Sequence, residues 1–494
     1  MRGITLTAAR ALALAGPTAL AFFAGGYFSE ARSWAGAGAW LGVLLAAAGA
    51  ARLPRSRPAR LALAGLSLLA AWTLLSILWA PIAGNAYHAG QITVLYLGAL
   101  LGGAMLFRGG SMRLLEPSLA AGTLLVIGYG LSERLLPGVL HFSASISANG
   151  RLEQPLTYWN AMGELAAIGF VLCARLAGDP GRHRALRAVA AGATAPLGLG
   201  LYISFSRGAL FACVAGLVAL VVLAARREQL GAVARSVIGA ALAVAAAAPF
   251  AGVTSLAGAL SERETQGAVV LVALLVITAL AAGGQLLTGR RERVGELRLP
   301  QHAPWLAGVV ICAGLALAIV LGAHESAHGT ARLPGGAVRL TTLQSNRYDY
   351  WSVALRAFGS EPLHGVGAGG WSVDWLRWRH VSEAAQDAHS LPLQTLAELG
   401  VVGFLFLLAL IIGIAGAAAR AVSGMRAVVG PVAALVVYLA HAPLDWDWQM
   451  PAVTLVAMVI AGAVLGQAEA EPAAADAAVA RATTEPPRYA EPRA

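Results

Sequence analysis

The sequence predicts an all-α, polytopic integral membrane protein with about fourteen transmembrane helices and one large extracytoplasmic loop. Three observations predict this fold: 58% of the 494 residues are hydrophobic, only 12% are charged, and the apolar residues fall into long runs. A typical soluble domain carries about twice that charged fraction. Too few charges remain to cover a chain of this length in water, so lipid must contact much of its surface.

The apolar runs define the predicted spans, because a hydrocarbon core about 30 Å thick needs roughly 20 apolar residues per helix. The runs lie near residues 11–28, 34–51, 61–80, 91–107, 116–134, 160–178, 188–205, 208–225, 236–253, 267–287, 304–322, 399–419, 427–444 and 450–467. Only Ser206 and Arg207 separate the seventh run from the eighth. Without that break, every later span would be inverted.

The distribution of positive charge tests this topology. All basic residues other than histidine are arginines, and most fall in segments that are cytoplasmic if Met1 is cytoplasmic. The short loops on the other side hold few, as the positive-inside rule requires. We therefore expect a multi-pass protein of the inner or plasma membrane with both termini cytoplasmic. The net charge of +10 is scattered between the spans rather than gathered on one face, so no nucleic acid partner is expected.

Five regions follow from this reading. They are N-terminal spans (1–135), central spans (136–322), a large extracytoplasmic loop between the eleventh and twelfth spans (323–398), C-terminal spans (399–467) and a cytoplasmic tail (468–494). The tail is rich in alanine, glutamate and proline, and we expect it to be disordered. Cys173, Cys213 and Cys312 all lie inside apolar runs, which favours packing over a zinc site or a disulfide. No metal and no cofactor are predicted.

The large loop holds two predicted helices. The first runs from Arg347 to Phe358 along the membrane surface, with apolar residues at helical spacing: Tyr348, Trp351, Leu355 and Phe358. Pro362 and the glycines of residues 365–370 end it. The second helix carries three tryptophans on one face: Trp371, Trp375 and Trp378. Interfacial anchoring is the plain interpretation of these tryptophans, and stacking on sugar rings is the alternative.

A third helix is predicted to begin at the end of the loop and to continue into the membrane. Ser390 is a suitable N-cap, and Pro392 is tolerated in a first helical turn. His389 would then stand at the N-terminus of this helix, where it is a candidate general base. An ordinary surface histidine is the alternative.

Four segments, taken together and in order, resemble the O-antigen ligase and polymerase family. The most specific is His389-Ser390, nine residues, Gly400, two residues and Gly403, which resembles the family's His-containing pattern before Gly-x-x-Gly. The other three are Ser204-Phe205-Ser206-Arg207-Gly208, Ser345-Asn346-Arg347 with Trp351, and Arg151 through Tyr158-Trp159-Asn160. The resemblance covers about residues 150–465. One departure is Pro392, where many members have an aromatic residue.

This resemblance implies a membrane-embedded glycosyltransferase or ligase of cell-surface polysaccharide. Such enzymes move a saccharide from an undecaprenyl diphosphate carrier to an acceptor hydroxyl on the extracytoplasmic face, without a metal. His389 would be the base, and Arg207 and Arg347 would be the catalytic cations that bind the diphosphate. Arg151 and Trp351 are further candidates for substrate binding. The alternative for each arginine is a lipid-headgroup anchor at a helix end.

Two questions stay open on the sequence. The acceptor of the glycan donor is a glycan, a lipid such as lipid A core, or a protein hydroxyl, with membrane lipid as the surrounding partner. The alternative function is a multi-pass transporter of a polysaccharide precursor or another solute. Transporters place polar groups near the bilayer midplane, often in paired repeats. Here the ionisable residues gather at one face, except Glu164 in the sixth span, which we expect to pair with an arginine.

Overall fold

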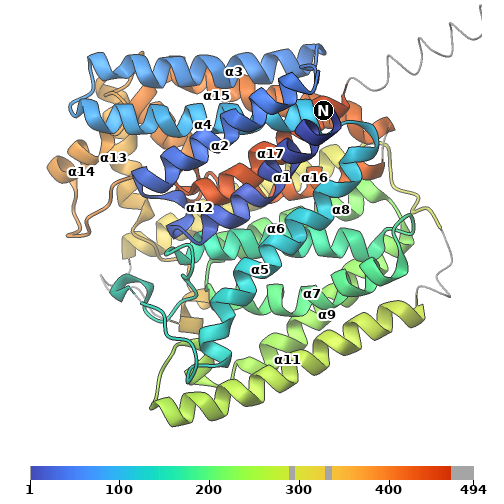
Figure 1. Cartoon of the computed structure of the whole chain (residues 1–494). Helices are drawn as coiled ribbons and strands as arrows, with labels where there is room; N and C mark the ends of the chain where they lie inside the picture. Colours follow the sequence, from blue (N-terminus) through green and yellow to red (C-terminus); the bar gives the residue numbers. More distant parts are fainter. Residues whose placement is uncertain (1, 144, 289–294, 329–335, 425, 469–494) are drawn as a thin grey trace, which may run out of the picture.

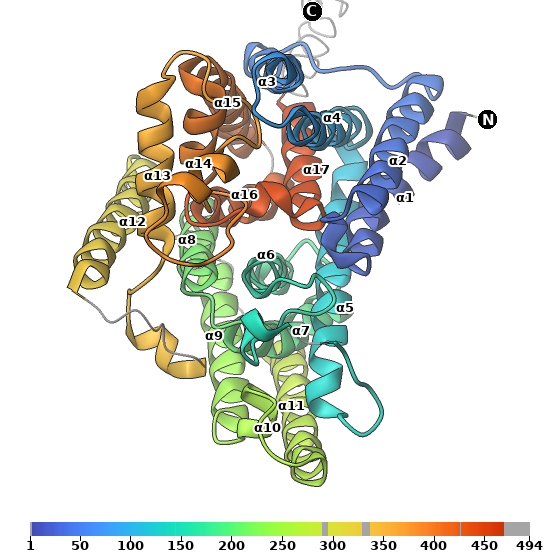
Figure 2. The ribbon, with the colours of Figure 1, turned by 90° about the vertical axis from the view of Figure 1, so that its left-hand side faces the viewer.

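The computed structural model describes residues 2–143, 145–288, 295–328, 336–424 and 426–468, and within them the chain is a bundle of long helices (Figures 1 and 2). A helix occupies each of the fourteen predicted runs. They are α1 (Arg2–Ala21), α2 (Ser29–Ala48), α3 (Arg57–Leu75), α4 (Ala83–Leu106), α5 (Leu115–Leu135), α6 (Trp159–Gly178), α7 (Arg184–Ile203), α8 (Arg207–Ala224), α9 (Arg227–Ala247), α11 (Leu260–Thr288), α12 (Ala303–His328), α15 (Leu391–Gly424), α16 (Val429–His441) and α17 (Pro451–Gln467).

Eleven helices of the described residues are long and apolar enough to cross a membrane. The helices α16 and α17 are apolar but shorter, and α2 does not meet the same criterion. The polytopic all-helical fold is therefore confirmed, whereas the count of fourteen spans stays a prediction. The first residues of α1 and the last of α17 lie at the same end of the bundle (Figure 1). The disorder predicted for the tail concerns residues 469–494, which lie outside the described residues.

The core of the bundle forms around α6, which is buried along its whole length and contacts α5, α7, α8, α9 and α16. Its sequence is rich in alanine and glycine, so neighbouring helices approach its backbone closely. Gly163 faces Ser204 and Ala209, and Gly169 faces Thr123. In contrast, α12 lies at the edge of the bundle, where it packs mainly on α8 and exposes most of its apolar surface.

The break between the seventh and eighth runs is confirmed by a tight turn. Helix α7 ends at Ile203, and Phe205 adopts a left-handed backbone conformation with φ +46°. Ser206 then caps α8, because its hydroxyl accepts a hydrogen bond from the Ala209 N–H at 3.2 Å. This geometry places Arg207 in the first turn of α8, at the end of the bundle that carries α13 (Arg347–Ser360) and α14 (Trp371–Trp378).

The large loop does form the two predicted helices, but the residues that they bury are not all those of the predicted apolar faces. On α13 the buried positions are Tyr350, Trp351, Val353, Ala354 and Ala357, whereas Leu355 is 54% exposed. Helix α13 packs on α15 through its buried residues, and Leu355 of the predicted apolar face is turned away from the protein. Contact of that face with lipid stays a prediction.

Membrane anchoring was the wrong interpretation for two of the tryptophans. Trp371 and Trp375 are fully buried and stack on each other with ring centres 5.5 Å apart. They form the core of the loop, because aromatic side chains are the largest apolar groups available to a small extramembrane unit. Trp378 is half-buried, and the guanidinium of Arg356 lies 4.4 Å from its ring centre.

Helix α15 is divided at Gly400, which explains the Gly-x-x-Gly spacing after His389. Gly400 has φ +64° and a non-helical ψ, so the first two turns of α15 form a separate short segment. A side chain at Gly400 would collide with the backbone of Leu363. The loop before α14 binds the backbone on both sides of Gly400. The Val401 N–H donates to the Pro362 carbonyl at 2.9 Å, and the Gly367 N–H donates to the Glu398 carbonyl at 2.8 Å. His389 is thereby held at the end of the bundle.

Candidate active site

The centre of the candidate site is the connecting segment between α16 and α17, residues 442–450. Its fully buried Asp445 carboxylate pairs with the guanidinium of Arg347, the first residue of α13. The other carboxylate oxygen accepts hydrogen bonds from the Tyr158 hydroxyl at 2.6 Å and the Trp446 N–H at 2.9 Å. Burial is the largest single influence and opposes ionisation, but the charge of Arg347, together with the nearby histidines and the hydrogen bond from Tyr158, outweighs it and lowers the pKa of Asp445. Arg347 is therefore held in place by a permanent negative charge.

Arg347 and Arg207 line one cavity of about 170 Å³, which we call the arginine cavity. Trp351 also lines it, so the three residues predicted to bind substrate there do meet. The remaining lining is mostly apolar and comes from α8, α12 and the loop: Gly208, Phe211, Leu315, Ala318, Ile319, Leu343, Ser345, Tyr348 and Leu444. The cavity thus combines two cationic side chains with a mostly apolar lining.

Arg207 has a second role that the sequence did not predict. One of its terminal nitrogens donates to the carbonyl of Thr342, and the other donates to the carbonyl of Gln344 at 3.0 Å. These carbonyls belong to the segment that leads into Arg347. Each terminal nitrogen of a guanidinium carries two hydrogens, so Arg207 can hold this segment and still offer donors to an anion.

Two further arginines add positive charge beside Arg347. Arg151 stacks on Trp159, with its guanidinium carbon 3.6 Å from the ring centre, and donates to the carbonyls of Ser147 and Ala148. Burial, together with the positive charges of Arg339 and Arg347, lowers the pKa of Arg151 to about 10. Arginines that repel one another in this way form a natural site for an anion. Arg339, from the short helix Gly336–Thr341, was not singled out by the sequence analysis.

His389 lies on the other side of Trp446. Its imidazole stacks on Trp446 with ring centres 5.0 Å apart, and Tyr350 lies on it at 5.1 Å. The Nδ1 atom is 2.8 Å from the backbone carbonyl of Asp387. Since a carbonyl oxygen only accepts, Nδ1 carries the proton, and in the neutral ring Nε2 is the atom with a free lone pair. This arrangement suits a general base.

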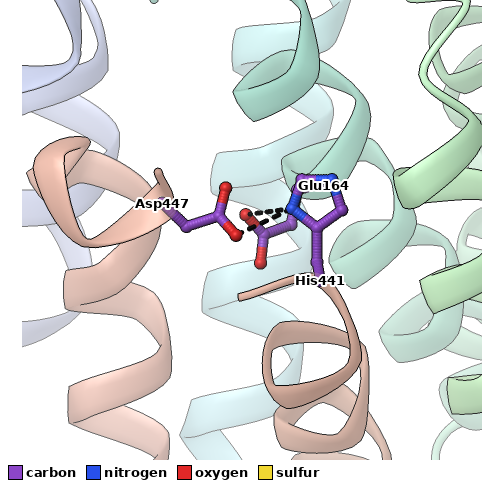
Figure 3. Close-up of side chains that lie close together, drawn as sticks. All are labelled: Glu164, His441 and Asp447. Atoms are coloured by element: carbon purple, nitrogen blue, oxygen red, sulfur yellow. Dashed lines mark hydrogen bonds and ion pairs between the residues drawn. The ribbon is translucent and has the colours of Figure 1, made fainter. Parts of the chain in front are cut away.

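A second buried cluster lies beneath the connecting segment (Figure 3). The Nδ1 atom of His441 is 2.8 Å from Asp447 and 3.3 Å from Glu164, and all three side chains are fully buried. The expectation that Glu164 pairs with an arginine was wrong, because α16 places His441 against α6 at this level. The three ligand atoms lie within 4.8 Å of one another, so the set could hold a metal ion. A proton shared between the imidazole and the two carboxylates also accounts for the short distances.

The structure thus brings most of the predicted residues together, though not into one cavity. Arg207, Arg347 and Trp351 share the arginine cavity, Arg151 lies beside it, and His389 lies across Trp446 from it. The sequence analysis missed Asp445 and Trp446, although two aspartates and two tryptophans alternate there between apolar helices. That alternation is the signal that could have found them, since charged residues in such a place are costly unless they are paired.

Comparison with known protein families supports the resemblance seen in the sequence. Residues 250–408 match the family model for O-antigen ligase. The match contains Arg347, Trp351 and His389, together with Gly400 and Gly403, and it begins after Arg151 and Arg207. None of the curated proteins matches the chain. The chain is therefore a polytopic membrane protein whose residues 250–408 match the O-antigen ligase family.

Proposed function

From this match to the O-antigen ligase family, we propose that the chain transfers a glycan from an undecaprenyl diphosphate carrier to an acceptor hydroxyl on the extracytoplasmic face. The observation that carries the proposal is the position of His389. Its ring has one nitrogen on a backbone carbonyl and stacks on Trp446, whose neighbour Asp445 binds Arg347 of the arginine cavity. The proposed base, His389, and the proposed site for the leaving group, the arginine cavity, therefore lie on either side of the segment that holds Asp445 and Trp446.

The arginine cavity suits the lipid diphosphate of the donor. Arg207 and Arg347 supply planar sets of donors for phosphate oxygens. The apolar residues Phe211, Leu315 and Ile319 continue the cavity between α8 and α12, where a polyprenyl chain would find apolar surface. Because α12 exposes most of its length, that surface can be reached from lipid.

The proposed reaction is a substitution at the anomeric carbon of the donor. Nε2 of His389 accepts the proton of the acceptor hydroxyl as its oxygen forms a bond to the anomeric carbon. The bond from that carbon to the phosphate oxygen breaks, and the diphosphate leaves with the electron pair. The arginines stabilise the charge that develops on it. The faces of Trp446 and Tyr350 and the nearby charge of Asp445 stabilise the imidazolium.

Three finer points belong to the same proposal. The arginines supply the positive charge that the diphosphate leaving group needs, so we propose that the transfer is independent of metal. We place the arginine cavity and His389 on the extracytoplasmic side and both termini in the cytoplasm, which follows the bias of the arginines along the sequence. The acceptor is a glycan, a lipid or a protein hydroxyl.

The test is to purify the protein in lipid, with EDTA present, and to supply an undecaprenyl-diphosphate oligosaccharide with candidate acceptors in turn. We expect release of undecaprenyl diphosphate that depends on an acceptor. The His389→Ala variant should lose this release, and His380→Ala, which changes an exposed histidine of the same loop, should keep it. A rate that requires added metal would contradict metal independence and point to Glu164, His441 and Asp447.

Unchanged release in His389→Ala would contradict the assignment of the base. No release with any acceptor, together with uptake of the intact lipid-linked saccharide into vesicles, would support the transporter instead. The depth of Glu164 argues against that outcome, because it lies in the second turn of α6, near the same end of the bundle as His389.

A further inference from the structure

A second cavity, with a volume of about 300 Å³, lies at the same end of the bundle, and we call it the polar cavity. Its walls come from segments far apart in the chain: the turn before α2, the first turns of α4, α14 and α15, and the connecting segment. The polar side chains include Arg32, Asn85, Gln386, Asp387, Gln394 and Glu398, and Tyr27 and Phe28 add aromatic surface.

The chemistry of the polar cavity is that of a carbohydrate site. Carboxylates and side-chain amides accept and donate hydrogen bonds to hydroxyl groups, and aromatic rings pack on the apolar faces of sugars. Gln394 is already oriented, because its amide donates to Asp387 at 2.8 Å and lies 3.5 Å from Glu398. The Glu398 carboxylate also faces the backbone N–H groups of Gly369 and Trp371. These contacts hold the polar groups of one wall in place.

The ionisable groups of the polar cavity differ from those of the arginine cavity. Two carboxyl groups, those of Asp387 and Glu398, line it together with one guanidinium, that of Arg32, and with His88. That guanidinium is turned toward protein, since it donates to the Tyr27 carbonyl at 3.2 Å. Burial raises the pKa of Asp387, as expected for a carboxylate without a cationic partner of its own. Burial also raises the pKa of Glu398 to about 8, so its carboxyl group is largely protonated at neutral pH and can donate a hydrogen bond to a sugar oxygen. Asp387 is then the acidic group of this cavity that disfavours a phosphate.

The polar cavity is connected to His389 through two of its lining residues. Asp387 lines the cavity, and its backbone carbonyl holds the Nδ1 atom of His389. From the other side, Tyr27 lines the cavity and lies 5.6 Å from Trp446, on which His389 stacks. The arginine cavity meets the same segment through Leu444 and Asp445. His389 is thus linked to the polar cavity through Asp387 and to the arginine cavity through Trp446 and its neighbour Asp445.

We propose that the polar cavity binds the acceptor, and that it selects a sugar that is neutral or carries an amino group over one that carries a phosphate. This inference rests on the proposed function, since it assigns the second substrate of the same transfer. The acceptor hydroxyl would enter from the side of Asp387, and the donor diphosphate from the side of Arg347. The two substrates then meet at His389 without sharing a binding surface.

The experiment compares two matched acceptors, an oligosaccharide and the same oligosaccharide carrying one phosphate, in the purified full-length protein. We expect kcat/KM to favour the unphosphorylated acceptor by about tenfold or more, because like charges across a binding site are disfavoured. The Asp387→Asn variant keeps the backbone carbonyl on His389 and should reduce that preference. Equal kcat/KM for the two acceptors in the wild type would overturn the selectivity.

The location of the acceptor site is tested with a residue of the polar cavity that comes from α4, a helix far in the sequence from His389. Asn85→Leu, in the first turn of α4, should raise the KM for the acceptor about tenfold while the KM for the donor changes less than twofold. Arg207→Lys is the matched variant for the arginine cavity. It should raise the KM for the donor about tenfold while the KM for the acceptor changes less than twofold. An unchanged acceptor KM in Asn85→Leu, in a protein that still transfers glycan, would overturn the acceptor site and leave the proposed function intact.

Acceptor binding is also measured without turnover, by saturation-transfer NMR on the His389→Ala protein. Binding that Asn85→Leu weakens would support the site even in a protein that does not transfer. Binding that Asn85→Leu leaves unchanged would overturn it. Loss of turnover in the wild type with every acceptor would count against the proposed function instead, so the two failures are distinguishable.

Discussion

The arginine cavity and the polar cavity lie at the same end of one bundle, yet they are built in opposite ways. The first combines two arginines with apolar side chains of α8 and α12. The second combines carboxylates and amides with the aromatic residues Tyr27 and Phe28. In the proposed transfer, the first cavity suits a lipid diphosphate and the second suits a sugar hydroxyl. Two separate cavities would let one protein hold two unlike substrates.

The connecting segment joins the two cavities. Along six residues, Leu444 lines the arginine cavity, Asp445 binds Arg347, Trp446 stacks on His389 and Gln449 lines the polar cavity. The segment is anchored below by Asp447, which contacts His441. Substitutions along this segment and beside it therefore test whether the two cavities act as separate sites.

The largest expected effect is that of His389→Ala, because His389 is the proposed base that acts where the two substrates meet. Removing a general base costs about 10²–10⁴-fold in rate. We expect kcat to fall by that amount while the KM for donor and acceptor changes little. Stopped-flow release of undecaprenyl diphosphate measures it. A variant that lost donor affinity instead would show that His389 belongs to the arginine cavity.

A second large effect is expected when the pair of Arg347 and Asp445 is broken. Arg347→Ala leaves a fully buried carboxylate without its cation, which costs about 3–5 kcal/mol for a buried pair and less here, since the Arg347 side chain is 20% exposed. Thermal unfolding in lipid nanodiscs measures this loss.

The double variant of Arg347→Ala with Asp445→Asn provides the control. Removing the orphaned charge should recover much of the stability but none of the transfer, because the diphosphate still lacks its cation. Recovery of both would mean that Arg347 serves only to neutralise Asp445.

Arg207→Lys should have an intermediate effect, on the arginine cavity alone. Lysine keeps the charge but cannot span the carbonyls of Thr342 and Gln344 while contacting a phosphate. We expect the kcat/KM for the donor to fall by about tenfold, roughly the value of one charge-assisted hydrogen bond. Steady-state kinetics with the donor as the varied substrate measures it, and Arg356→Lys on the outer face of α13 is the control.

A smaller effect is expected from acid. The pKa of Asp445 is lowered in the folded protein, so its ionised form stabilises the fold above the ordinary aspartate value of 3.8, and this contribution is lost as the pH falls through the lowered value. Asp445→Asn should be less stable than the wild type at neutral pH and lose less stability between pH values of about 5 and 3. Parallel stability curves for the two proteins would contradict the pairing.

The smallest effect is expected from Glu164→Gln. The amide oxygen of glutamine can still accept from His441, so the connecting segment should keep its place and both KM values should stay within about twofold. Metal content of the wild type and the variant, measured by mass spectrometry, completes the test. A stoichiometric metal that the variant loses would identify the cluster in Figure 3 as a cation site rather than a shared-proton site.

The sequence by itself determined the helices and the local breaks. Apolar runs decided where the fourteen long helices lie, because the hydrophobic effect acts on each run separately. Ser390 and Pro392 indicated the start of α15, since the conformation of a helix start is a local property. His389 could be singled out for the same reason, because it stands at a predictable helix start.

Only the tertiary structure decided which side chains meet. Asp445 reaches Arg347 across 98 residues, and the N-terminal spans, which the sequence described only by hydropathy, supply Tyr27, Arg32 and Asn85 to the polar cavity. Trp371 and Trp375 changed from expected membrane anchors to core residues for a related reason. Such contacts depend on the packing of distant helices, and neither the spacing nor the composition of one segment encodes its neighbour.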